Sequence, residues 1–347
     1  ASCIDDPDLD EAVLEAFRQR DKHKLKIEPL TDAERTAIVQ QVPSLSAKTL
    51  DEEVQIGLLL ANPATENPLF LLVALEELRG FGSFEYLDHR IAQFPRPHED
   101  EPRWQRWLMD AREDAQRLKD EKKRLDRLTR LDAIESRLES THPVNDPLTT
   151  VFLQVIDRLN DEFDTNVVRE VLSLLASARS GLSRRELVDL VEGEDVEIGD
   201  SRGDLFPVLR QLRPYLQRRG KLIDFFHRGL FKAVREMYLS SDERRVAAHR
   251  LLADYFAEQP YYLDQPDPVD PAVKIRIPHE RKVVELPWQR LEAAKLGGND
   301  DPRFAYWDDV TDLLTDWQFL EAKNAAGNIF ELAVDFRSAW QAIPHGH

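Results

Sequence analysis

The residues whose types could do chemistry are scattered along the sequence, and they do not combine into a complete reactive set. The 347-residue sequence contains neither G-x-x-x-x-G-K-[ST] nor G-x-G-x-x-G, the glycine patterns that cradle phosphates. His279 and Glu280 begin the zinc-protease pattern H-E-x-x-H, but Val283 stands where the second histidine ligand is needed. Cys3 has no neighbouring histidine to activate it. The sequence therefore predicts no catalytic residue and no metal site, and the chain alone is not expected to be an enzyme.

His227 is the residue whose position most favours ligand binding. It closes an apolar run, Lys221 to Phe226, and a helical pattern begins at Arg228. An imidazole at such a junction can donate a hydrogen bond to a phosphate oxygen, and that bond is lost when the flanking domains separate. The alternative is a half-buried histidine whose hydrogen bonds are satisfied by the backbone. The sequence leaves both interpretations open.

The elements around His227 have the order of a winged-helix domain, expected over residues 148–259. Arg219 and Gly220 predict a tight turn between two short strands. Ser183 and Glu186 form a capping box at the start of one helix. The other helices of this domain are predicted at residues 148–163, 167–178, 205–212 and 242–258, with a further helix from Arg228.

Residues 31–94 are predicted to form a small helical domain. Asn67, Pro68 and Leu69 begin its third helix, because proline lacks the N–H that the first helical turn leaves unpaired anyway. Its helices are expected at residues 31–41, 50–60, 67–80 and 86–94, the first of them started by a capping box of Thr31 and Glu34.

Residues 95–147 are predicted to hold two linkers around a long charged helix or helical hairpin at 103–140. A narrow apolar stripe runs along this segment with charges on its other faces, as in a coiled-coil seam. One interpretation is a solvated helix that rests on its own domain, and the other is a partner-binding coiled coil. The partner-binding residues would be Trp104, Leu118, Leu125 and Leu131.

The two ends of the chain look like parts of larger units. Residues 1–30 have a strand-helix-strand pattern, and we interpret them as the C-terminal remnant of an α/β nucleotide-binding domain. The opening ASCIDDPDLDE resembles the interior of a domain, so we expect a fragment or a processed product. Residues 260–347 are predicted to be a C-terminal helical linker region, extended at 260–271 and helical at 281–294, 307–314, 319–327 and 330–340.

Composition indicates the broad class. Lys and Arg number 47 against 65 Asp and Glu, and the resulting net charge of −18 disfavours a nucleic-acid or anionic-membrane partner. Only 13 glycines argue against a β-rich chain. A single cysteine favours a reducing compartment, and no apolar run is long enough to span a membrane. We expect a mainly α-helical, multi-domain, cytoplasmic protein that acts through protein–protein contacts.

Several stretches, in their order, resemble one class of protein. They are KIEPLTDAER, NPLFLLVALEELRGFGS, LSLLASARSGLSRREL, LRPYLQRRGKLIDFFHRGL and HRLLADYF, followed by ELPWQRLEAA and LLTDWQFLEAKNAAGNIFELAVDF. This series is similar to the STAND class of signal-transduction NTPases. It is more closely similar to the NACHT-type members that carry WD-repeat or tetratricopeptide sensors. The resemblance covers most of the chain except residues 103–140.

The resemblance implies a nucleotide-dependent switch. In that class a phosphate-loop domain, a helical domain and a winged-helix domain hold ADP in a closed state, and exchange for ATP permits oligomerisation and activates an effector. Asn67, Pro68 and Leu69 match the motif that packs on the nucleotide base, and His227 matches the histidine that contacts the β-phosphate. Arg228 departs from the aspartate that usually follows, which puts the local interaction of that aspartate in doubt.

The resemblance also implies which ligands and partners the chain would have. ADP or ATP with Mg²⁺ is implied only together with an upstream phosphate-loop domain, because this sequence contains no phosphate loop. Effector and sensor modules, and a homo-oligomer on activation, are the implied protein partners.

Two other functions stay open from the residues alone. One is a winged-helix DNA-binding regulator, which the net charge opposes. Its basic third helix and wing would be formed by Arg210, Arg213, Arg218 and Arg219. The other is a helical protein-interaction adaptor that recruits a partner through residues 103–140.

Overall fold

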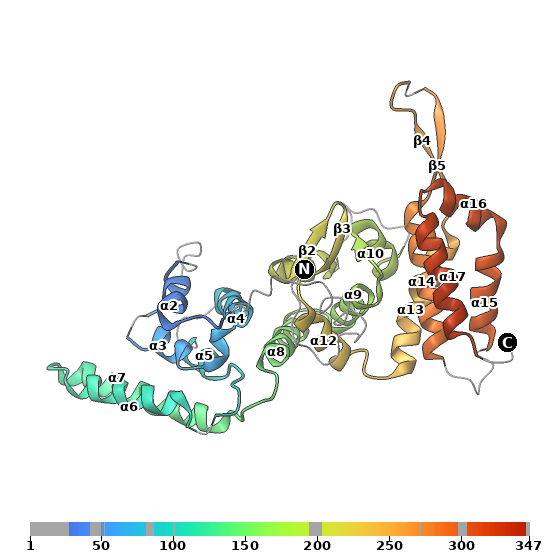
Figure 1. The fold of residues 1–347 in the computed structure, drawn as a ribbon. Helices are drawn as coiled ribbons and strands as arrows, with labels where there is room; N and C mark the ends of the chain where they lie inside the picture. Colours follow the sequence, from blue (N-terminus) through green and yellow to red (C-terminus); the bar gives the residue numbers. More distant parts are fainter. Residues whose placement is uncertain are drawn as a thin grey trace.

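The computed structural model describes residues 28–41, 50–51, 53–80, 87–99, 101–193, 203–270, 272–297 and 304–344. Within them the fold is mainly α-helical with two small antiparallel sheets, so the predicted fold class is confirmed. Figure 1 shows a helical unit at one end, the C-terminal helices at the other and a central unit between them. Nearly all of the predicted α/β remnant at 1–30, Cys3 included, lies outside the described residues.

In its described residues the helical unit contains four α-helices and one short 3-10 helix. They are α2 (Asp32–Gln41), α3 (Gln55–Leu60), η2 (Pro63–Glu66), α4 (Pro68–Gly80) and α5 (Leu87–Ala92). The predicted capping box is present, because the Thr31 N–H donates to Glu34 Oε2 at 2.8 Å and the Glu34 N–H donates to Thr31 Oγ1 at 3.3 Å. α3 begins later than predicted, because the Asp51 carboxylate accepts from the Val54 N–H at 2.8 Å and holds the preceding residues in a turn.

The charged segment is a helical hairpin of α6 (Arg103–Gln116) and α7 (Glu121–Ser140). Asp120 ends the turn between them by accepting from the Lys123 N–H at 3.1 Å, which caps α7. α7 rests on the helical unit, where Arg130 pairs with Asp88 and with Asp51. The hairpin therefore lies against its own unit, which is the first of the two interpretations of this segment.

The described residues of the central unit form six α-helices and a three-stranded sheet. They are α8 (Pro147–Glu162), α9 (Thr165–Ser177), β1 (Leu182–Ser183), α10 (Arg184–Val191), α11 (Leu205–Leu212), β2 (Leu216–Arg219), β3 (Leu222–Phe225), α12 (Arg228–Met237) and α13 (Asp242–Glu258), with the 3-10 helix η4 (Arg213–Tyr215) before β2. The sheet has the antiparallel order β1-β3-β2. Helices followed by a hairpin are the element order predicted for a winged helix, and β1 was not predicted.

The turn of the β2–β3 hairpin differs by one residue from the prediction. Arg219 pairs with Leu222, so the two turn residues are Gly220 and Lys221. Gly220 takes a positive φ of 62°, which glycine adopts without the steric cost that a side chain brings.

The C-terminal region begins with a second hairpin, β4 (Tyr262–Pro266) and β5 (Lys274–Pro278), which projects from the body in Figure 1. The stretch predicted as extended, residues 260–271, thus contains the paired strand β4, and β5 was missed. Four helices follow: α14 (Glu280–Leu296), α15 (Phe304–Thr315), α16 (Trp317–Ala325) and α17 (Ile329–Ala342). α13 packs along α14 and also on α9, so it connects the central unit to the C-terminal helices. Among the described helices none has the length and apolar character needed to cross a bilayer.

Candidate functional site

His227 is the N-cap of α12 and lies half-buried at the end of the β2–β3 hairpin. Its Nδ1 accepts a hydrogen bond from the Gly229 N–H at 2.9 Å. Gly229 is buried against Phe152, and a Cβ there would come within 2.9 Å of that ring, so the close approach requires glycine. The backbone contact that was the alternative to a phosphate contact is therefore present.

The same hydrogen bond fixes the tautomer of the His227 ring. A neutral imidazole has one nitrogen that accepts and one that donates, and Nδ1 is the acceptor here. The proton must then sit on Nε2, which is left as a donor. Burial lowers the pKa of His227, which favours this neutral form. The backbone contact and a donor role toward a ligand are thus compatible.

The residues that follow His227 carry positive charge into a nearby cavity. Arg228, Lys232 and Arg235 line this cavity of about 680 Å³ between α12 and the start of α8, together with the acids Asp146 and Glu236. Arg228 is the residue that departs from the aspartate of the STAND motif. This departure places positive charge beside the histidine.

Asn67, Pro68 and Leu69 lie at the start of α4, as predicted. The Asn67 side-chain oxygen accepts from the N–H groups of Leu69 and Phe70 at 2.9 and 3.3 Å, so it caps the helix. Asn67 and Pro68 are exposed and Leu69 is half-buried. α4 and α12 both pack on α8, but in the described part of the chain no hydrogen bond joins Asn67 to His227.

The four residues predicted to bind a partner differ in their accessibility. Leu131 is completely buried within its own unit, and Trp104 is half-buried beneath the guanidinium of Arg96, 5.4 Å from its ring centre. Leu118 is half-buried at the hairpin turn. Leu125 alone of the four is largely exposed, at 64%.

Glu77 joins the helical unit to the central unit, and its role was not predicted. It lies on α4 and is 1% exposed. Arg158 of α8 donates from Nε to Oε2 and from Nη2 to Oε1, each at 2.9 Å. The Tyr215 hydroxyl donates to Oε1 at 3.1 Å, and Arg90 donates to Oε2 at 3.3 Å. We refer to these four residues as the Glu77 clamp.

Two members of the Glu77 clamp, Arg158 and Tyr215, have shifted pKa values. Burial alone would lower the pKa of Arg158, but the hydrogen bonds and charge of Glu77 outweigh burial and raise that pKa. Burial, and then the negative charge of Glu77, raise the pKa of Tyr215 well above its ordinary value. Arg158 therefore stays charged and Tyr215 stays a donor across the physiological pH range.

A sequence signal for the clamp exists. α4 is apolar on nearly every face, so a carboxylate within it requires a cationic partner from another element. The partner could not be assigned, because Arg158 and Tyr215 are 81 and 138 residues further along the chain.

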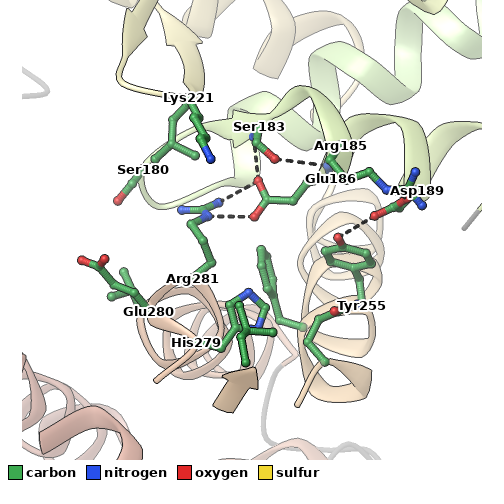
Figure 2. Close-up of a pocket in the computed structure, with 15 residues that line it drawn as sticks. Ser180, Ser183, Arg185, Glu186, Asp189, Lys221, Tyr255, His279, Glu280 and Arg281 are labelled. Carbon is green, nitrogen blue, oxygen red and sulfur yellow. Dashed lines mark hydrogen bonds and ion pairs between the residues drawn. The ribbon is translucent and has the colours of Figure 1, made fainter. Parts of the chain in front are cut away.

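A cleft of about 760 Å³ lies between α10 and the start of α14, and Figure 2 shows its charged lining. Arg281 Nε donates to Glu186 Oε1 at 2.8 Å, and the Tyr255 hydroxyl donates to Asp189 at 2.9 Å. Glu186 also accepts from the Ser183 N–H at 2.6 Å, which completes the predicted capping box. Much of the charge in this cleft is already paired. These paired side chains connect two units instead of acting as reactive groups.

Glu285 of α14 strengthens the same junction and is completely buried. It accepts from the backbone N–H groups of Arg179 and Ser180 at 3.0 and 3.1 Å, just beyond the end of α9. Arg281 donates to Glu285 as well, at 3.1 Å. The central unit is thus fastened on one side by the Glu77 clamp and on the other by α14.

Comparisons with known proteins give two partial similarities. No protein-family model matches the chain, and no solved structure matches it. The chain is 22% identical over 282 residues to a TPR repeat-containing protein of Dictyostelium discoideum, across 80% of this chain and 13% of that protein. It is 30% identical over 179 residues to NACHT domain- and WD repeat-containing protein 1 of Homo sapiens, across 41% of this chain and 11% of that protein.

These similarities support the coarse form of the resemblance seen in the sequence. The chain is a helical protein related in part to proteins with TPR repeats or with a NACHT domain and WD repeats. It spans only about an eighth of the length of these curated relatives.

Proposed function

We propose that this chain is the regulatory, helical and winged-helix part of a nucleotide-dependent signalling switch. The observation that carries the proposal is the geometry of His227. Its Nδ1 is held by the Gly229 N–H, and its Nε2–H is oriented by that contact as a donor. A phosphate oxygen is the acceptor that such a donor would meet in a STAND-type switch.

In this proposal the hydrogen bond of His227 to the nucleotide forms only when the nucleotide is bound against the central unit. Its Nε2–H donates to the β-phosphate of ADP in the closed state, and Asn67, Pro68 and Leu69 face the base. The phosphate loop and the Mg²⁺ ligands come from a nucleotide-binding domain outside this sequence, so the chain itself hydrolyses nothing. The Glu77 clamp keeps the helical and central units docked in the closed state. Exchange for ATP separates them and frees surfaces for effector and sensor contacts.

Two substitutions at His227 separate the ligand contact from the capping contact. Asparagine keeps a short acceptor that caps α12 but removes the distal donor, whereas glutamine keeps a distal N–H and weakens the cap. In the full-length natural protein, His227→Asn is expected to speed ADP release about tenfold, the loss of one charge-assisted hydrogen bond. His227→Gln is expected to release ADP at a rate close to that of wild type. Equal ADP release from wild type and His227→Asn would exclude the proposal.

A second candidate function is a helical protein-interaction adaptor. It is favoured by an apolar surface on α16 and α17, where large side chains are exposed by 41 to 83%: Trp317, Ile329, Phe330, Val334, Phe336 and Trp340. Monomeric proteins seldom leave so many large apolar side chains uncovered in one place. The similarity to a TPR repeat-containing protein also fits an adaptor.

The two candidate functions predict different effects of the same two variants. A switch loses ADP retention with His227→Asn and keeps it when Phe330 and Trp340 are both changed to serine. An adaptor without nucleotide loses partner binding with the double serine variant and is indifferent to His227→Asn. Measuring ADP release and partner binding on both variants distinguishes the two.

A further inference from the structure

A small cavity of about 240 Å³ lies where the helical unit meets the central unit, beside the Glu77 clamp. Its lining includes four arginines from four elements: Arg79 on α4, Arg158 on α8, Arg210 on α11 and Arg213 at the start of η4. Glu76 is the one acidic residue among the lining residues. So many guanidinium groups around one cavity are unexpected in a chain with a net charge of −18.

The charges of this cavity are only partly compensated. Arg158 is used by Glu77 and by Glu162, to which it donates at 3.0 Å. Arg79 pairs with Glu76 at 2.5 Å. Within the described residues Arg210 and Arg213 have neither a hydrogen bond nor an ion pair with a protein acceptor. In the described part of the chain, these two exposed guanidinium groups thus line one cavity without an ion-pair partner.

This cavity is distinct from the predicted nucleotide contacts. Asn67, Pro68 and Leu69 lie at the start of α4, whereas Arg79 and Gly80 lie at its end. A helix rises 1.5 Å per residue, so the two ends of this 13-residue helix are about 18 Å apart. A ligand in the cavity would not occupy the position predicted for the base of ADP.

We propose that the cavity binds a small phosphate-bearing anion of the size of pyrophosphate. Guanidinium groups match phosphate oxygens with paired, charge-assisted hydrogen bonds, and two unpaired ones at one partly enclosed cavity favour a multiply charged anion. Arg210 and Arg213 supply the free charge, and Arg79 approaches from the other unit. The anion therefore bridges the two units.

A bridging anion acts on the arrangement of the units. It contacts both units only when they are docked, so it binds that state more tightly and shifts the population toward it. The regulatory consequence rests on the proposed switch function, whereas the binding itself does not. The anion would then add to the Glu77 clamp in stabilising the closed arrangement.

Isothermal titration calorimetry of this chain with sodium pyrophosphate tests the site, with NaCl of equal ionic strength as the salt control. Wild-type protein is expected to bind one equivalent with a dissociation constant on the order of 1 mM or below. Arg210→Ala/Arg213→Ala is expected to bind at least tenfold more weakly. Arg218→Ala/Arg219→Ala removes two exposed charges from the wing and is expected to bind like wild type.

Each other outcome overturns a defined part of the proposal. Absence of saturable wild-type binding, or equal weakening by both double variants, means that the cavity is not a site. Unchanged binding by Arg79→Ala with loss in Arg210→Ala/Arg213→Ala means that the central unit holds the anion alone, and the bridging is wrong. Because no nucleotide-binding domain is needed, failure here leaves the His227 proposal untouched.

Discussion

Glu77 and Arg158 form a bidentate ion pair between the helical and central units, with both N–O distances at 2.9 Å. Glu77 is completely enclosed and Arg158 is 12% exposed, so this pair is shielded from water and salt. A pair so placed is sensitive to the loss of either partner, because the other is left charged and buried. The junction between the units therefore includes a buried ion pair beside its apolar packing.

Glu77→Gln is expected to destabilise the chain by about 3 kcal/mol, since Arg158 loses its buried counter-charge. Chemical denaturation followed by tryptophan fluorescence measures the change. Glu76→Gln is the matched control, because Glu76 is the neighbouring acid, is 24% exposed and pairs with Arg79 at the surface. That variant is expected to change stability by less than about 1 kcal/mol. Equal effects of both variants would contradict a specific clamp.

Stability is expected to fall as the pH drops below about 6.5, in part through His227. Burial lowers the pKa of His227 in the folded chain, so the unfolded chain binds more protons in that range. Protonation also places a hydrogen on Nδ1, which can then no longer accept from Gly229. His249 and His279 have lowered pKa values for the same first cause, burial, and contribute to the same trend.

The share of His227 in this pH dependence can be isolated with His227→Asn, which retains a cap and does not titrate. Thermal denaturation between pH 5 and pH 7, which brackets the ordinary histidine pKa, should show a shallower slope for this variant. A slope identical to that of wild type would show that His227 has the same proton affinity in both states.

Gly181→Ala is expected to destabilise the central unit by roughly 2 kcal/mol more than Gly220→Ala. Both glycines have a positive φ, 78° and 62°. A Cβ on Gly181 would come within 2.3 Å of the Ile223 carbonyl oxygen, whereas one on Gly220 meets nothing within 4 Å. The difference between the two unfolding free energies therefore measures the contact of Gly181 with β3, and equal values would rule that contact out.

Leu131 and Leu125 provide a test of the α6–α7 hairpin. Leu131→Ala is expected to destabilise by about 2–5 kcal/mol, because that side chain is completely buried. Leu125 is 64% exposed, so Leu125→Ala is expected to leave stability within about 0.5 kcal/mol. If the hairpin also binds a partner, Leu125→Ala lowers that affinity while the unfolding curve stays in place. A stability loss with Leu125→Ala would place that side chain in a core.

The sequence predicted the elements that depend on local signals. α11 and α13 begin and end at the predicted residues, and both capping boxes are formed. Capping and helical periodicity act over three or four residues, so they can be read without knowledge of the fold. β5 (Lys274–Pro278) was missed because it pairs with β4. The proline-rich stretch that contains β4 was predicted only as extended, without a partner strand.

The contacts between the units could not be predicted from local sequence patterns. The role of Glu77 was not predicted, because its partners Arg158 and Tyr215 come from elements far along the chain. His227 was singled out by its position after an apolar strand, and the structure adds its role as a helix cap.

The most direct test is the distance between the helical and central units in the full-length protein with ADP and with ATP. Spin labels at Ala37→Cys on α2 and Asp254→Cys on α13, both exposed positions, with Cys3 replaced by serine, suit double electron–electron resonance. We predict one short distance with ADP and a longer one with ATP, and Glu77→Gln should populate the longer distance even with ADP. A single distance common to ADP and ATP would contradict a nucleotide-dependent switch.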